Sequence, residues 1–299
     1  MKSIRFILTL LTALPTLVHA AINVFACEPE WGALTREIGG DAVKVYTATS
    51  AMQDPHRIEA RPSLIAQTRR ANLVVCTGAE LEVGWLPVLL RESGNADVQP
   101  GRPGFFEAAR HVSMLDKPAR IDRSQGDVHA SGNPHIQTDP RNIARVGAAL
   151  AQRLAEIDPA NAAAYQTRWK NFSARWDAAI TRWQQQATPL KGMPLVVQHK
   201  SFTYLLNWLG MREVATLEPK PGVEPSVGHL AEVAARLKTT PAKAVLRAAY
   251  QSPRASEWLA QRAGIPAIAL PFTVGGATGT DDLFGLFDVT LAELLKATK

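Results

Sequence analysis

Three of the seven histidines lie in polar loops at the ends of predicted structural elements, where their side chains can meet a ligand. They are His56 after Asp54-Pro55, His135 after Asn133-Pro134, and His199 at the end of the apolar run Pro194–His199. Ligands of open α/β sheets gather at the carboxyl ends of the strands. The spacing of the three residues matches no local metal motif, so only a fold that joins the three loops makes them one site.

A carboxylate is the fourth candidate. The glycine-rich stretch Gly275–Asp282 follows the last predicted strand and precedes a predicted helix over Leu283–Leu295. An aspartate in such a place is usually the N-cap of the helix. Because Asp281 and Asp282 stand in a row, one of them remains for another role. Three neutral imidazoles and one carboxylate suit a borderline ion such as zinc.

Other sequence signals of chemistry are weak. The chain contains no Gly-x-Ser-x-Gly elbow, no phosphate-binding glycine loop, no dinucleotide fingerprint and no His-Glu-x-x-His helix. We therefore name no catalytic and no cofactor-binding residue and expect no enzyme. His129 lies close enough to His135 in the chain to be a secondary metal contact.

The elements that must position these residues alternate between short apolar runs and helical patterns, which is typical of parallel sheets covered on both faces. The predicted strands are Ile22–Cys27, Val43–Thr49, Leu73–Thr77, Pro194–His199, Glu213–Leu217, Ala242–Ala248 and Ala267–Pro271. Helices are predicted through Trp31–Ile38, Pro62–Arg70 and Tyr204–Leu209, besides the terminal one. The chain thus reads as an α/β protein with two (β/α) halves.

One long helix is predicted between these halves. Asp139-Pro140 and Asp158-Pro159 each provide an N-cap and a first-turn proline, and the long helix follows the second pair. An apolar stripe follows at steps of three and four: Tyr165, Trp169, Phe172, Trp176, Ile180 and Trp183. Such a helix is about 40 Å long at a rise of about 1.5 Å per residue, enough to span two lobes. We read the aromatic side chains as core.

The first twenty residues resemble an export signal. Met1–Arg5 carries two positive charges, Phe6–Val18 is apolar, and Val18-His19-Ala20 offers small residues before a cut. The apolar run is too short for a membrane-spanning helix, which needs about 20 residues. We expect the signal to be cleaved and the mature chain to begin near Ala21, outside the cytoplasm.

The amino-acid composition limits the kinds of partner that the chain can bind. Hydrophobic residues make up 46% of the chain and charged residues 20%, a globular balance. The net charge of +6 comes from 33 basic and 27 acidic residues that are interspersed, so we expect no nucleic-acid partner. Cys27 and Cys76 each end an apolar run. Export permits a disulfide between them, but two buried thiols are an equal alternative because sequence does not supply the geometry.

Taken together, these motifs resemble the ZnuA-like metal-binding receptors of bacterial ABC importers over essentially the whole mature chain. The resemblance is carried by Asp54-Pro55-His56 with Arg61-Pro62-Ser63, by Asn133-Pro134-His135 with Asp139-Pro140, by His199 with Tyr204-Leu205, and by the loop that ends in Asp282. It implies two lobes joined by one rigid helix, with the metal bound between them. The boundaries are then residues 1–20 for the signal peptide, 21–157 for the N-terminal lobe, 158–188 for the linking helix and 189–299 for the C-terminal lobe.

The resemblance also implies ligands and partners. His56 and His135 would come from the first lobe, and His199 and an aspartate from the second. We prefer Asp282 to Asp281 because Phe284, two residues later, matches the family pattern. Manganese-type relatives have a carboxylate where this chain has His199, so zinc is expected rather than manganese. The implied protein is a monomeric periplasmic receptor that delivers the ion to an inner-membrane ABC permease.

Three other functions remain as alternatives. A zinc-dependent hydrolase shares the three histidines and an open coordination position, although no spare general base stands beside these motifs. A manganese-selective receptor of the same family differs only in its preferred ion. A receptor for an organic solute needs polar and aromatic groups in the cleft.

Overall fold

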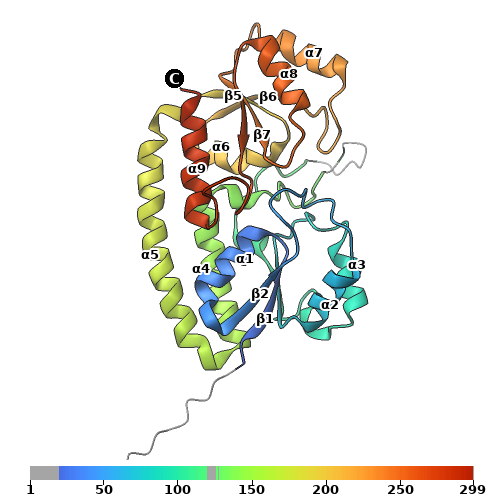
Figure 1. Ribbon diagram of the computed structural model, residues 1–299, viewed down its shortest axis with the longest axis vertical. Helices are drawn as coiled ribbons and strands as arrows, with labels where there is room; N and C mark the ends of the chain where they lie inside the picture. Colours follow the sequence, from blue (N-terminus) through green and yellow to red (C-terminus); the bar gives the residue numbers. More distant parts are fainter. Residues whose placement is uncertain (1–19, 120–125, 127, 299) are drawn as a thin grey trace, which may run out of the picture.

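The computed structural model describes residues 20–119, 126 and 128–298, and Figure 1 shows two lobes, each built round one sheet. The predicted export signal lies outside the described residues, apart from Ala20. Both sheets have four parallel strands, in the orders β2-β1-β3-β4 and β6-β5-β7-β8. The strands are β1 (Ile22–Ala26), β2 (Val43–Thr47), β3 (Leu73–Cys76), β4 (Phe105–Glu107), β5 (Pro194–Val197), β6 (Arg212–Thr216), β7 (Ala244–Ala248) and β8 (Ala267–Leu270).

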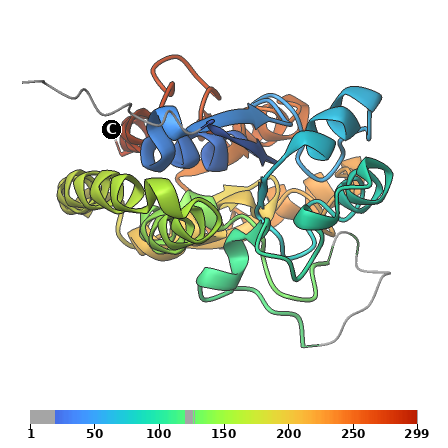
Figure 2. The same ribbon diagram turned by 90° about the horizontal axis from the view of Figure 1, so that it is seen from below.

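Helices cover both faces of each sheet. They are α1 (Pro29–Gly39), α2 (Pro62–Arg70), α3 (Leu86–Ser93), α4 (Pro140–Ile157), α5 (Ala162–Gln186), α6 (Thr203–Leu209), α7 (Val227–Arg236), α8 (Arg254–Ala263) and α9 (Leu283–Lys296). Seen from below, α1, α4 and α5 lie together on one side of the N-terminal lobe, and α2 and α3 lie on the other (Figure 2). This two-sided cover explains why the strands read as continuous apolar runs rather than as alternating patterns.

Helix α5 joins the lobes. It packs against α1 and α4 of the first lobe and against α9 of the second, and it runs along one side of the N-terminal lobe as far as α9 (Figure 1). The predicted stripe is buried most deeply at Tyr165, Trp176 and Trp183, each 0% exposed. The indole nitrogen of Trp183 donates to Asp288 on α9 at 2.6 Å. As a result, one continuous apolar core extends through both lobes.

Several boundaries differ from the prediction. The long helix is shorter than residues 158–188 because Pro159–Asn161 and Thr188–Leu190 form separate 3₁₀ turns. Asp158 therefore does not cap the helix; its carboxylate accepts a hydrogen bond from the Tyr165 hydroxyl at 2.5 Å. By contrast, Asp139 caps α4 as predicted, accepting from the backbone nitrogen of Arg141.

The strand order of the first sheet decides whether Cys27 and Cys76 can form a disulfide. Strands β1 and β3 are parallel neighbours with Ala26 opposite Val75, so the next residues, Cys27 and Cys76, also lie side by side. They form a disulfide with a Cα–Cα distance of 4.8 Å. Both residues are fully buried.

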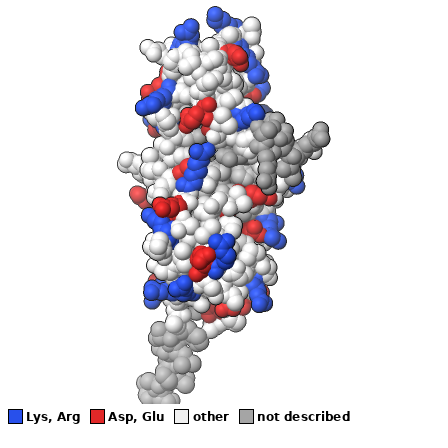
Figure 3. All heavy atoms as spheres, turned by 90° about the vertical axis from the view of Figure 1, so that its right-hand side faces the viewer, with Lys and Arg blue, Asp and Glu red and all other residues white. Residues whose placement is uncertain are grey.

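The surface carries both signs of charge. On the face shown in Figure 3, lysine and arginine side chains alternate with aspartate and glutamate over the length of the molecule. Within residues 20–119, 126 and 128–298, no helix has the length and apolar character needed to cross a membrane.

Candidate metal centre

The structure brings His56, His135 and His199 together between the two lobes. Their ligand nitrogens all lie within 4.8 Å of one another. The Nε2 atoms of His135 and His199 are 3.2 Å apart. The ring centroid of His56 lies 5.2 Å from that of His135 and 5.8 Å from that of His199. Loops far apart in the chain therefore meet in one cluster of imidazoles.

His56 is held by a tight turn after β2. The Asp54 carboxylate accepts hydrogen bonds from the backbone nitrogen of His56 at 3.0 Å and from its Nδ1 at 2.8 Å. Burial opposes ionisation of Asp54, but its hydrogen bond to His56 and the nearby imidazole charge lower its pKa below the ordinary value. The indole of Trp85 donates to the Pro55 carbonyl and anchors the same turn. The Nε2 of His56 is thereby directed to the cluster.

His135 is held where the lobes touch. Asn133 accepts a hydrogen bond from the backbone nitrogen of His135 at 3.0 Å and donates to the Lys200 carbonyl of the second lobe at 2.8 Å. The Tyr204 hydroxyl donates to the Asn133 carbonyl at 2.7 Å. Phe272, from the loop after β8, packs edge-on against the His135 ring. His135 is only 1% exposed, so its position depends on both lobes.

His199 lies two residues beyond β5, and Glu218 lies two residues beyond β6. Val197 and Thr216 are opposite each other in the parallel pair, so continuing the register places His199 beside Glu218. The Nδ1 of His199 donates to Glu218 Oε2 at 2.7 Å. This carboxylate also accepts from the backbone nitrogen of Gly222. A carboxylate that accepts a hydrogen bond from Nδ1–H orients the imidazole ring and leaves Nε2 free to bind a metal.

The electrostatics favour a cation at the cluster. Burial, followed by the neighbouring imidazoles, lowers the pKa of His135 well below its ordinary value, so the ring stays neutral. In the described part of the chain, His56 Nε2 is buried and has no hydrogen-bond partner. Two nitrogens bound tetrahedrally at about 2.0–2.1 Å lie about 3.3 Å apart, close to the 3.2 Å between His135 and His199. The donor set thus fits a zinc-like ion.

A cavity connects this cluster with the surface. It has a volume of about 280 Å³ and is lined by both lobes, including His135 and Asn133 from the first and His199 from the second. His129 also lines it, and its ring lies 5.3 Å from that of His56. The expected secondary contact of His129 with a metal stays a prediction.

The fourth expected ligand, Asp282, is not brought to the imidazoles. Both Asp281 and Asp282 are exposed, and Asp282 caps α9 by accepting from the backbone nitrogen of Gly285 at 2.7 Å. The preceding loop closes on itself, with Gly275 donating to the Thr280 carbonyl, which keeps Asp282 at the helix start. This corrects our expectation, and the ligand set that we carry forward consists of the three histidines.

Sequence reasoning missed the carboxylates behind the rings. Asp54 is two residues before His56, a spacing that allows a side chain to bond its own turn. Glu218 is distant in the chain from His199, and only the pairing of β5 with β6 reveals their contact. The supporting role of Asn133 likewise depends on contacts between lobes.

Replacing Glu218 by glutamine is expected to weaken zinc binding about 10- to 100-fold, the usual effect of losing an outer partner of a ligand histidine. The glutamine oxygen still accepts from His199 Nδ1, so the loss reports the missing charge. Competition titration against a chelator of known affinity measures it. Glu224→Gln, an exposed change in the same loop, is the control, and equal affinities of the two variants would contradict the assigned role.

A second polar contact between lobes involves a buried carboxylate. Glu30, in the first turn of α1, accepts a hydrogen bond from the Thr273 hydroxyl at 2.5 Å. Burial raises the pKa of Glu30 from 4.5 to about 7, although the bond to Thr273 opposes the shift. The folded chain therefore keeps this proton in a pH range where the unfolded chain has released it.

Metal-free protein should accordingly lose stability through Glu30 as the pH rises from about 4.5 to 7. Compared with Glu30→Gln, the wild type should lose about 1–3 kcal/mol of unfolding free energy over this range. Denaturant unfolding at several pH values measures the difference. Glu257→Gln, an exposed change on α8, should follow the wild type. Parallel curves for the wild type and Glu30→Gln would refute the prediction.

Solved structures and curated proteins resemble this chain. "Crystal structure of ZnuA" superposes with a TM-score of 0.75 at 22% identity and covers 92% of this chain and 98% of that one. The "High-affinity zinc uptake system protein ZnuA" of Brucella abortus is 27% identical over 111 residues, which are 37% of this chain and 33% of that protein. The "Manganese ABC transporter substrate-binding lipoprotein scaA" of Streptococcus gordonii is 25% identical over 187 residues, 58% of this chain and 57% of that protein.

The matches to these curated relatives span less than two thirds of their lengths. The family described as "ZnuA: Zinc-uptake complex component A periplasmic" matches residues 24–297, nearly the whole described chain. With the two-lobe fold and the histidines between the lobes, this match shows that the chain belongs to the ZnuA family.

Proposed function

We propose that this chain is a periplasmic receptor that captures a zinc ion with His56, His135 and His199 and delivers it to an inner-membrane ABC permease. The observation that carries the proposal is the convergence of three imidazoles between the lobes, two of them hydrogen-bonded through Nδ1 to carboxylates. Nitrogen ligands suit zinc, whereas manganese favours carboxylate and water oxygens. Some relatives are named for zinc and others for manganese, so membership of the family is compatible with either metal.

The domain division and the export belong to the same proposal. Residues 1–20 are the cleaved signal, residues 21–157 and 189–299 the two lobes, and residues 158–188 the link. Support comes from the separate sheets and from α5, which packs against both lobes. The receptor works as a monomer, because the ligands all come from one chain.

Binding rather than turnover is the proposed task. The carboxylates of Asp54 and Glu218 accept hydrogen bonds from the Nδ1 atoms of the imidazoles. A hydrolase instead needs a general base beside the metal-bound water. Zinc-loaded protein should hydrolyse ester and phosphate substrates no faster than free zinc. Hydrolysis well above that rate, lost in His199→Ala, would favour the hydrolase.

Elemental analysis of the protein isolated from the periplasm tests the receptor directly. We expect stoichiometric zinc in the wild type, and little zinc in His56→Ala and His199→Ala. In a strain that depends on this receptor and its permease, the same variants should reduce zinc uptake. Manganese as the main ion in the wild type, or full zinc in both variants, would overturn the proposal.

A further inference from the structure

A second cluster of metal-ligating atoms lies in the N-terminal lobe, separate from the histidines. Cys27 directly follows β1, Cys76 ends the neighbouring strand β3, and Glu82 lies in the loop after β3. Both sulfurs and a carboxylate oxygen of Glu82 lie within 4.8 Å of one another, and all three residues are buried. The disulfide uses the sulfurs in the oxidised chain.

Glu28 lies beside Glu82 at this cluster and has an unsatisfied oxygen. Its Oε2 accepts from the backbone nitrogen and the hydroxyl of Thr77 at 3.3 and 3.2 Å, and Glu82 Oε1 accepts from the same nitrogen at 2.7 Å. Glu28 is 3% exposed, and among the residues that the structure describes its Oε1 has no hydrogen-bond partner. A buried carboxylate oxygen without a partner is costly. A cation between the two carboxylates and the sulfurs would satisfy it.

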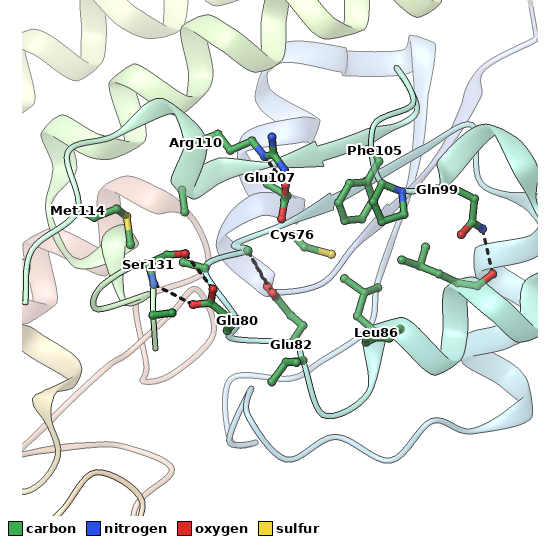
Figure 4. A pocket seen from close by; sticks show the side chains of 18 of the residues that line it. Cys76, Glu80, Glu82, Leu86, Gln99, Phe105, Glu107, Arg110, Met114 and Ser131 are labelled. Carbon is green, nitrogen blue, oxygen red and sulfur yellow. Dashed lines mark hydrogen bonds and ion pairs between the residues drawn. The ribbon is translucent and has the colours of Figure 1, made fainter. Parts of the chain in front are cut away.

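An open cavity gives access to the cluster. It has a volume of about 840 Å³, and Cys76 and Glu82 lie in its wall with Leu86, Phe105 and Glu107 (Figure 4). Figure 4 shows the Cys76 sulfur and the Glu82 side chain in the same hollow. No histidine lines this cavity within the described ranges, so it is distinct from the cavity at the imidazoles.

We propose that reduction of the Cys27–Cys76 disulfide creates a second metal site, in which the two thiolates, Glu82 and Glu28 bind a thiophilic divalent ion of the zinc and cadmium class. A dithiol supplies the two electrons: the protein S–S bond breaks, an S–S bond forms in the dithiol, and two protons pass to the cysteines. Metal binding then releases these protons, because the thiolate is the ligand. Two sulfurs and two carboxylates form a four-ligand set that tetrahedral zinc accepts and manganese does not favour.

The test uses folded wild-type protein whose histidine site is first filled with zinc. One portion is reduced anaerobically with dithiothreitol and freed of reductant, and another stays oxidised; cadmium is then titrated into both. The reduced portion should bind one further equivalent of metal and show the ultraviolet charge-transfer band of cadmium thiolates. The oxidised portion should show neither. Absence of the band in the reduced chain, or loss of its circular dichroism on reduction, would overturn the proposal.

Variants separate a four-ligand site from a mere pair of thiols. Glu82→Gln should weaken cadmium binding of the reduced chain about 10-fold or more and leave zinc binding at the histidines unchanged. Glu80→Gln is the matched control, because Glu80 lines the same cavity but bonds Ser131. Cys76→Ser should abolish the band, and circular dichroism checks that each variant folds. Equal cadmium affinity of Glu82→Gln and Glu80→Gln would assign the metal to the cysteines alone and refute the site.

Discussion

Replacing His135 by alanine is expected to lower the zinc affinity by more than about 100-fold, beyond the usual effect of losing an outer partner. His135 is the most deeply buried of the three imidazoles, and its Nε2 lies 3.2 Å from that of His199. Its replacement leaves two histidine ligands and puts a methyl group where the third imidazole was. His56→Ala and His199→Ala should show losses of the same order. Competition titration with a zinc chelator measures all three.

Thermal unfolding provides an independent measurement of the same effect. A ligand at a hundredfold excess over its Kd stabilises the native state by about 2.7 kcal/mol, so zinc should raise the Tm of the wild type and the chelator should lower it. The three alanine variants should lose most of this shift. His229→Ala is the control, because His229 donates to the Thr216 carbonyl and is not one of the clustered imidazoles. A normal zinc-induced shift in the three variants would rule out the assigned site.

Asp282→Ala distinguishes the observed site from the four-ligand site expected at first. Because Asp282 caps α9, its loss should cost about 1 kcal/mol of stability and leave the zinc affinity unchanged. A large loss of affinity in this variant would show that Asp282 reaches the metal.

Zinc binding should also weaken in mild acid, by at least about 10-fold between pH 7.5 and 5.5. An imidazole binds metal only when neutral, and a histidine with the ordinary pKa near 6.5 costs about tenfold in affinity at one unit below that value. Burial lowers the pKa of His135, so this ring has no proton for the metal to displace in this pH range. Calorimetric titrations at several pH values measure the trend. A zinc affinity that is flat over this range would contradict an imidazole site.

The lowered pKa of His135 also makes the stability of the fold depend on pH. The unfolded chain binds a proton at His135 below pH about 6.5, whereas the folded chain does not. The stability that His135 contributes to metal-free protein should therefore be lost as the pH falls through this range, opposite in sign to the contribution of Glu30. His135→Gln, which removes the titrating group, should lose less.

The preference for zinc over manganese should depend on position 199. His199→Glu adds an oxygen ligand, which favours manganese. In this fold the new carboxylate would lie beside Glu218, and the two like charges would repel. We therefore expect the double change His199→Glu/Glu218→Gln to shift preference toward manganese more than the single change. Competition between the two ions decides the point, and an unchanged preference in both variants would contradict the role of this position.

Much of the fold could be predicted because its signals are local. Apolar runs, N-caps and the aromatic stripe mark β1, α4 and α5 within a residue or a few of their true ends. The short strand β4 was missed, since Phe105–Glu107 is too brief to form a pattern. The three histidines were found because each stands at a loop that follows an apolar run or precedes a capped helix.

The sequence by itself determined the two βα halves, the long helix and the three imidazoles, because each depends on residues close together in the chain. Only the tertiary structure decided which distant residues meet. The parallel registers place Cys27 beside Cys76 and His199 beside Glu218, and no local pattern encodes such registers. Asp282 shows the reverse case: a hydrogen bond to Gly285, three residues away, forms within the helix start. That local bond does not depend on how the two lobes pack together. The carboxylate therefore caps α9 instead of reaching the imidazoles.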